Sequence, residues 1–350
     1  MRPPSGLGRI DEDEEGFGDS FQSLWSFSIL LIARNKGRKS TIGSWKDGFD
    51  VAEDYHVDDN NTYRIYAAGK EGPIVFCIHG AGGSGLSFTL LAKYSKGFCR
   101  MYAPDLRCHV GNTHVENESD LSAATLTKEC LLLLNHILPD TPENKNIPII
   151  LFGHSMGGGI AVHVANDPSI RDRIRGLIVV DVVEGTALES LPVMMGVLRK
   201  RPTEFYCYED AIDWSVDTHL LHNRASACIS IPDQLVMENH VLRWRTNLFD
   251  TEKYWKGWYE DMSNRFLQSP AIKMLILAGR ERMDTPLIIA HMQGKFQLVL
   301  QNGMGHYIHE DAPQEISDVL QRYLRRYGFL IQEGAKNGSN GSLFHTLQFP

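Results

Sequence analysis

The chain has 350 residues and a formal net charge of −8 at pH 7, which excludes the strongly basic surface typical of proteins that bind nucleic acid or acidic membranes. A hydrophobic fraction of 43% and a charged fraction of 22% are those of an ordinary soluble globular protein. The six cysteines are scattered without a Cys-x-x-Cys pair, so neither a zinc site nor a disulfide framework is indicated, and a reducing compartment is expected.

Residues 1–55 mix proline, glycine, serine and acidic residues, which predicts a flexible leader. Residues 11–15 are acidic, whereas a secretory signal needs a basic region before its apolar stretch. The apolar run at residues 24–33 has about half of the roughly 20 residues needed to cross a bilayer. We therefore expect no secretory signal and no membrane span.

Strands and helices alternate through the first half of the chain. Residues 62–67 alternate in polarity and predict an edge strand, and the uniformly apolar residues 73–78 predict a strand that is covered on both faces. A glycine-rich loop and a helix over residues 86–94 follow, and then a short strand within residues 99–106. Residues 122–138 repeat apolar side chains at steps of three and four, as an amphipathic helix does.

Further apolar strands are predicted at residues 149–152, 176–181, 274–279 and 296–300, and a last helix at residues 313–327. Strands that alternate with helices predict an α/β fold with a mostly parallel sheet and helices on both faces.

Residues 186–262 interrupt this rhythm with mixed apolar and charged patterns that look helical. We interpret them as a helical cap inserted into one domain that spans residues 56–330. Residues 331–350, rich in glycine, serine and asparagine, predict a flexible tail.

Ser155 lies at the centre of a Gly-x-Ser-x-Gly motif, between an apolar strand and a helical segment. This context is the one that a nucleophile elbow requires, because the sharp turn holds a serine hydroxyl clear of the fold and near a base. The alternative is a glycine-rich turn in which the serine is incidental.

An oxyanion loop is predicted at residues 79–83, where the sequence His-Gly-Ala-Gly-Gly ends a strand. Such a loop supplies one backbone N–H, from Ala81 or Gly82, and the residue after the nucleophile, Met156, supplies another. A phosphate-binding glycine turn is the alternative, but the Walker lysine and the Gly-x-Gly-x-x-Gly spacing are missing.

The general base is predicted to be His306, in a glycine-rich loop after the last strand, since the order in this fold is serine, acid, histidine. His309 is the competitor, and we interpret it as a first-turn or surface residue of the final helix. Asp181 and Asp284 both follow core strands, and spacing alone does not choose between them as the acid. Asp284 precedes Thr-Pro, which is also typical of a helix cap.

A broader resemblance covers residues 63–329, which are similar to the protein phosphatase methylesterases, a branch of the α/β-hydrolase superfamily. Besides Gly-His-Ser-Met-Gly-Gly, the resemblance depends on four segments: residues 181–187, 252–258, 292–297 and 305–313. Two features depart from the family pattern: Ala81 stands where the oxyanion loop usually has glycine, and the cap is compact at residues 229–244.

The resemblance implies a serine carboxylesterase that removes the methyl ester from the C-terminal leucine of the protein phosphatase 2A catalytic subunit. It implies Ser155, Asp181 and His306 as the catalytic triad, no metal or organic cofactor, and a cytosolic or nuclear setting. Two alternatives use the same fold: a general small-molecule carboxylesterase without a protein substrate, and a catalytically silent binding protein.

Overall fold

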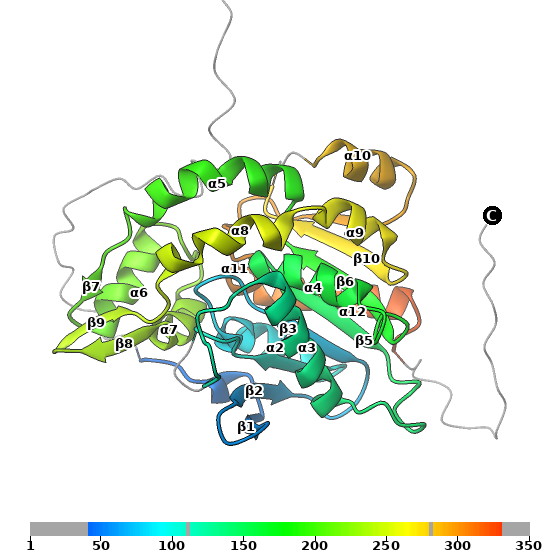
Figure 1. The fold of residues 1–350 in the computed structure, drawn as a ribbon, viewed down its shortest axis with the longest axis horizontal. Coiled ribbons are helices and arrows are strands. Elements are labelled where there is room, and N and C mark those ends of the chain that lie inside the picture. Colours follow the sequence, from blue (N-terminus) through cyan, green and yellow to red (C-terminus); the bar gives the residue numbers. More distant parts are fainter. Residues whose placement is uncertain (1–40, 110–112, 280–282, 331–350) are drawn as a thin grey trace, which may run out of the picture.

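The structure is a computed structural model that describes residues 41–109, 113–279 and 283–330. An eight-stranded sheet runs through its centre in the order β1-β2-β4-β3-β5-β6-β10-β11 (Figure 1). Strand β2 is antiparallel to β1 and β4, and every other neighbouring pair in the sheet is parallel. The strands are β1 (Val51–His56), β2 (Thr62–Ala68), β3 (Ile74–Ile78), β4 (Arg100–Pro104), β5 (Ile149–His154), β6 (Ile174–Val180), β10 (Ile272–Leu277) and β11 (Gln297–Leu300).

Helices cover both faces of this sheet. One apolar cluster joins the sheet to α3 (Ala123–Ile137), α4 (Met156–Asn166), α8 (Glu252–Tyr259), α9 (Met262–Gln268) and α10 (Thr285–Met292). A second cluster, on the other face, joins it to α2 (Thr89–Ser95), α11 (Ile308–Asp311) and α12 (Pro313–Arg326). The predicted α/β layering is therefore confirmed.

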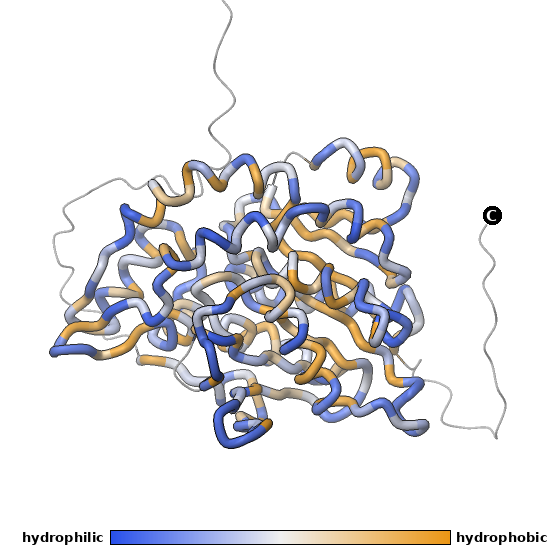
Figure 2. Tube along the Cα trace, viewed as in Figure 1, coloured by the Kyte–Doolittle hydropathy of each residue, from blue (hydrophilic) through white to orange (hydrophobic). Residues whose placement is uncertain are grey.

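The alternation of side chains along the central strands explains the two clusters. Strand β3 is buried along its whole length; Ile74, Phe76 and Ile78 enter the first cluster, while Val75 and Cys77 enter the second. The central strands of the sheet are mostly coloured as hydrophobic in Figure 2, in agreement with this two-sided burial. A strand buried on both faces needs apolar residues at every position, which is why its sequence shows no alternation.

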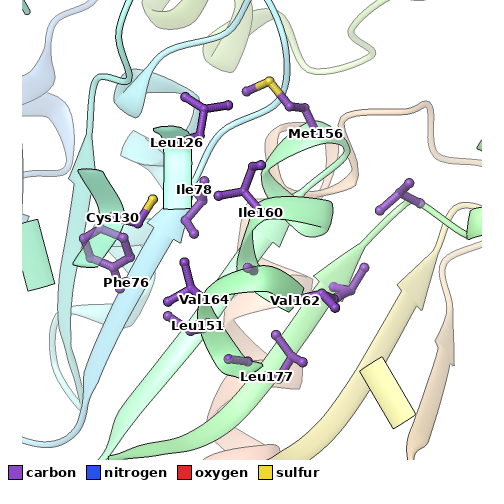
Figure 3. Packing of buried hydrophobic residues seen from close by; sticks show 14 of the residues in the cluster. Phe76, Ile78, Leu126, Cys130, Leu151, Met156, Ile160, Val162, Val164 and Leu177 are labelled. Carbon is purple, nitrogen blue, oxygen red and sulfur yellow. The ribbon is translucent and has the colours of Figure 1, made fainter. Parts of the chain in front are cut away.

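Helix α4 packs closely on the sheet because its first turns are made of glycine. A Cβ atom on Gly157 would lie 2.1 Å from the carbonyl oxygen of Ile78, and one on Gly159 would lie 2.4 Å from that of Trp258. Beyond these glycines, Ile160, Val162 and Val164 fill the interior (Figure 3). The helix that follows Ser155 is thus held against both β3 and α8.

The flexible leader predicted for residues 1–55 ends too late, because ordered elements begin before residue 55. Trp45–Asp47 form a short 3-10 helix, Phe49 is buried in the second cluster, and β1 is the edge strand of the sheet, so β2 is not. The side chains of β1 are mostly exposed, and an edge strand without a buried face lacks the apolar alternation that a strand prediction needs. Most of the predicted leader, with its apolar run, falls in residues 1–40, and these residues lie outside the described ones. The predicted tail at residues 331–350 also lies outside them.

The cap is not wholly helical. It contains α5 (Glu184–Leu198), α6 (Tyr208–Asp217) and α7 (Arg224–Asp233), but also a separate antiparallel sheet in the order β7-β9-β8. These strands, β7 (Glu204–Phe205), β8 (Leu235–Glu238) and β9 (Val241–Trp244), are each four residues or fewer, too short for a clear alternating pattern. A 3-10 helix at Leu248–Thr251 leads from this sheet into α8.

Within the described ranges, no helix is long and apolar enough to cross a membrane.

Two glycine substitutions test how closely α4 must pack. We expect Gly159→Ala to lower the free energy of unfolding by about 1–3 kcal/mol, because the added methyl group collides with the backbone of α8. Gly257→Ala is the matched control: it lies on the exposed side of α8, and its added methyl group would meet nothing within 4 Å. Gly257→Ala should raise the free energy of unfolding by about 0.4–1 kcal/mol. Urea denaturation of both variants measures the difference, and equal effects would contradict the packing argument.

Candidate active site

Ser155 stands between β5 and α4 in a strained backbone conformation. Its φ is 52° and its ψ is −121°, values that cost a residue with a Cβ atom about 1–3 kcal/mol. The Ser155 N–H donates to the carbonyl of Val180 at 3.0 Å, which ties the turn to the end of β6. The predicted strand–turn–helix elbow is therefore present, and Ser155 remains partly exposed.

The structure brings Asp181 and His306 together from loops that follow β6 and β11. Nδ1 of His306 lies 2.7 Å from Oδ2 of Asp181, and the other carboxylate oxygen accepts the N–H of Ala278 at 2.8 Å. The Asp181 side chain is 2% exposed and that of His306 is 21% exposed. A buried carboxylate with both oxygens bonded holds the imidazole in one orientation and directs its other nitrogen, Nε2, toward the pocket.

Asp284 has a different place. It is the N-cap of α10, where its Oδ1 accepts the N–H of Leu287 at 3.2 Å, and its other oxygen accepts the hydroxyl of Ser263. Of the two carboxylates that the residues alone left open, the one bonded to His306 is Asp181, while Asp284 caps a helix.

His309 lies in the first turn of α11, but the expectation of a surface position is wrong. Its ring is fully buried, 4.7 Å from the ring of Phe88 and 4.7 Å from that of His154. Burial lowers the pKa of His309 to about 3, and neither ring nitrogen has a hydrogen-bond partner. Glu310 and Asp311, which follow His309, suggested exposure, but α11 packs against α2, α7 and α12.

The predicted oxyanion loop wraps against Ser155. The N–H of Gly83 donates to Gly80 at 3.1 Å and closes a turn in which Gly82 has a φ of 78°. A Cβ on Gly80 would lie 3.2 Å from the Cβ of Ser155, so glycine allows this close approach. In the described part of the chain, the N–H groups of Ala81 and Gly82 have no backbone acceptor.

Met156 begins α4, and the first N–H groups of a helix have no intrahelical acceptor. The N–H groups of Ala81, Gly82 and Met156 are therefore available as oxyanion donors, and that role stays a prediction.

Two buried histidines hold these loops in place. His79 accepts the N–H of Leu106 at Nε2 (3.0 Å) and bonds the carbonyl of Gly80 through Nδ1 (2.8 Å). Nε2 of His154 lies 2.9 Å from the carbonyl oxygen of His306 and donates to it. Burial lowers the pKa of both histidines well below the ordinary value, so each imidazole is neutral and acts as a fixed polar link.

Above Ser155 the cap closes a cavity of about 130 Å³. Its walls are largely apolar and come from α5, α8 and the 3-10 helix before α8; they include Ala187, Leu191, Met194, Leu248, Trp255 and Trp258. Because the sheet contributes the polar groups and the cap contributes the apolar walls, the site is suited to an ester with an apolar acyl part.

Sequence reasoning missed Tyr259 and Arg201, which also line this cavity. Burial raises the pKa of Tyr259 to about 12, and a polar interaction with the Ser155 side chain partly offsets that rise. Among the hydrogen bonds of the described residues, none joins the Ser155 hydroxyl to His306. Both missed residues belong to the cap, and no motif marks them in the sequence.

Comparison with known proteins identifies the family. A family model described as the alpha/beta hydrolase family matches residues 74–319. The chain is 41% identical over 318 residues to protein phosphatase methylesterase 1 of Schizosaccharomyces pombe, covering 88% of this chain and 91% of that protein. It is 36% identical over 343 residues to the human protein of the same name, covering 84% and 87%. The chain belongs to the protein phosphatase methylesterase family of α/β hydrolases.

Membership in this family makes the protein a carboxylic-ester hydrolase, and the resemblance drawn from the sequence is confirmed. The fold agrees with that of solved structures: E-2-(acetamidomethylene)succinate hydrolase matches with a TM-score of 0.65 at 16% identity, covering 79% of this chain and 99% of that one. At that identity the likeness concerns the fold alone.

The buried ring of His309 predicts a pH-dependent loss of stability. With a pKa of about 3 in the folded protein and about 6.5 when unfolded, its neutral form stabilises the fold above pH 6.5, and this contribution is lost as the pH falls toward 3. Between pH 7 and pH 5, the free energy of unfolding should fall by about 2 kcal/mol because of His309.

His309→Phe keeps a planar ring beside Phe88 but cannot take up a proton. We therefore expect its free energy of unfolding to fall by about 2 kcal/mol less between pH 7 and pH 5 than that of the unmodified protein. Urea denaturation at both pH values measures this difference. An identical pH dependence in the two proteins would show that His309 is not buried as a neutral ring.

Proposed function

We propose that this methylesterase demethylates the C-terminal leucine methyl ester of the protein phosphatase 2A catalytic subunit, with Ser155, His306 and Asp181 as its catalytic triad. The observation that carries the chemistry is the 2.7 Å pairing of His306 with a buried carboxylate next to a serine at a strained turn. The substrate is supported by the names of relatives that match 84–88% of the chain. Buried free cysteines such as Cys77, Cys99 and Cys130 suit the reducing cytosol or nucleus.

The reaction begins at Ser155. With Nδ1–H of His306 donated to Asp181, Nε2 carries a lone pair that takes the Ser155 proton as the hydroxyl oxygen attacks the ester carbonyl. The hydroxyl, which interacts with Tyr259 in the structure, turns toward His306 for this step. The negative charge that forms on the carbonyl oxygen is held by the backbone N–H of Met156 and by one from Ala81 or Gly82.

Collapse of this intermediate breaks the bond to the methoxy oxygen. His306 returns the proton, methanol leaves, and the leucine acyl group remains bonded to Ser155. Water then attacks this acyl-enzyme by the same route, with His306 as base, and releases the free C-terminal carboxylate and Ser155. One water is consumed and one methanol is formed, and the chemistry requires no metal or organic cofactor.

The alanine at position 81 is compatible with this role. The oxyanion donors are backbone groups, so the loop needs its shape more than a particular side chain. The residue at the left-handed position of the turn is Gly82, with a φ of 78°, and Ala81 is not at a positive φ.

Ser155→Ala tests the proposed function. Removal of the nucleophile should reduce demethylation of carboxymethylated phosphatase catalytic subunit by at least about 10³-fold, since what remains is binding and oxyanion stabilisation. The loss of methyl groups from the phosphatase is measured directly, with p-nitrophenyl acetate as a second substrate. If the unmodified protein hydrolyses the acetate but leaves the phosphatase methylated, it is a general carboxylesterase instead.

The role of Asp181 is tested by two matched carboxylate-to-amide changes. Asp181→Asn should lower kcat by about 10⁴-fold, because the amide favours the wrong tautomer of His306. Asp284→Asn should keep kcat within a few-fold of the unmodified value, because an asparagine still caps α10. A near-normal rate for Asp181→Asn would refute the assignment of the acid.

A further inference from the structure

The cavity above Ser155 contains one charge that the triad does not use. Among the described residues that line it, Arg201 is the single lysine or arginine, and Asp181 is the single carboxylate. Asp181 is already paired with His306. No ion pair of the described residues involves Arg201, so its guanidinium lies in a largely apolar cavity without a counter-charge.

Arg201 follows the end of α5, and its side chain packs on Trp244. The backbone N–H of Arg201 donates to the carbonyl of Leu198, the last residue of α5, at 3.1 Å. The guanidinium carbon lies 3.9 Å from the ring centre of Trp244 on β9. Its Nε is buried and has no hydrogen-bond partner. Burial lowers the pKa of Arg201 to about 10, so the side chain still carries its charge at neutral pH.

A half-buried arginine whose Nε is buried without a partner is costly to hold in an apolar cavity without an acceptor. The face of Trp244 compensates part of the lost hydration, but the N–H groups in the plane of the guanidinium bond only to acceptors. A planar fork of N–H donors matches the oxygens of a carboxylate, and it also bonds a peptide carbonyl. A ligand that enters the cavity can therefore bring an acceptor to Arg201.

The chemistry of the ester indicates which part of the substrate lies near Arg201. The leaving group of a methyl ester is a single carbon, so the cavity space beyond Ser155 receives the acyl side, which is the C-terminal end of the peptide. The cap walls near α5 and α8 accept its apolar side chain, and Arg201 lies in the same cavity with Tyr307 and Leu220.

We propose that Arg201 is a specificity-determining residue that binds an oxygen acceptor of the peptide on the acyl side of the ester. This proposal rests on the proposed function. The acceptor is an acidic side chain or a main-chain carbonyl of the residues that precede the C-terminal leucine, and the two sources are separated by the test.

The test compares Arg201→Met with the unmodified protein on three kinds of substrate. These are leucine methyl ester peptides with one aspartate placed in turn at each preceding position, the same peptides with asparagine in its place, and p-nitrophenyl acetate. We expect Arg201→Met to lower kcat/KM for peptides by about 10- to 100-fold, mainly through KM, and to change the acetate rate less than two-fold.

The pattern across the peptides identifies the acceptor. A loss confined to one aspartate peptide assigns an acidic side chain, and an equal loss on all peptides assigns a main-chain carbonyl. Equal kcat/KM for the variant and the unmodified protein on every peptide overturns the proposal. An equal loss on peptides and acetate also overturns it, because Arg201 would then act only on the shape of the site.

Controls separate binding from folding. Arg199→Gln changes an exposed arginine two residues away and should leave every rate unchanged. Arg201→Met keeps the length of the side chain against Trp244, so its urea denaturation midpoint should stay close to that of the unmodified protein. Arg201→Lys keeps the charge, so its KM for peptides should lie between those of Arg201→Met and the unmodified protein. If the unmodified protein cleaves the acetate but no peptide ester, the proposed function fails as well, whereas failure of the Arg201 variants alone leaves it intact.

Discussion

The backbone of Ser155 is the constraint on which the rest of the site depends. A positive φ is unfavourable for a serine, and the surrounding packing must hold it there. The N–H of Ser155 is fixed on the carbonyl of Val180, while the turn after it is fixed by Gly157, whose missing side chain lets α4 approach the end of β3. The exposure of one hydroxyl is thus a consequence of how a helix packs on a parallel sheet.

Neutral histidines extend this constraint to the neighbouring loops. Burial keeps His79 and His154 uncharged, and a neutral imidazole offers one donor and one acceptor. His79 uses both to tie Gly80 to Leu106, and His154 donates to the backbone of His306. The loops after β3 and β4 are therefore fixed to each other, and the end of β5 is fixed to the loop after β11, by groups that take no proton in the reaction.

The sheet and the cap have separate tasks. The carboxyl ends of the parallel strands carry Ser155, Asp181, His306 and the glycine-rich loop after β3, where ligands bind in open α/β sheets. The cap supplies the walls of the cavity, the hydroxyl of Tyr259 and the charge of Arg201. Chemistry common to many hydrolases can in this way be combined with recognition of one kind of acyl group.

The sequence by itself determined the structural features that depend on residues adjacent in the chain. The strand, turn and helix around Ser155, the glycine-rich loop after β3 and the parallel layering follow from local patterns, because two-sided burial and tight turns require particular residues at adjacent positions. Residue spacing did not separate Asp181 from Asp284, because both follow core strands. The family resemblance implied Asp181, and the tertiary structure places that carboxylate against His306 while Asp284 caps a helix. The exposed edge strand β1, the small sheet in the cap and the burial of His309 were out of reach of the sequence, because each depends on contacts between segments far apart in the chain.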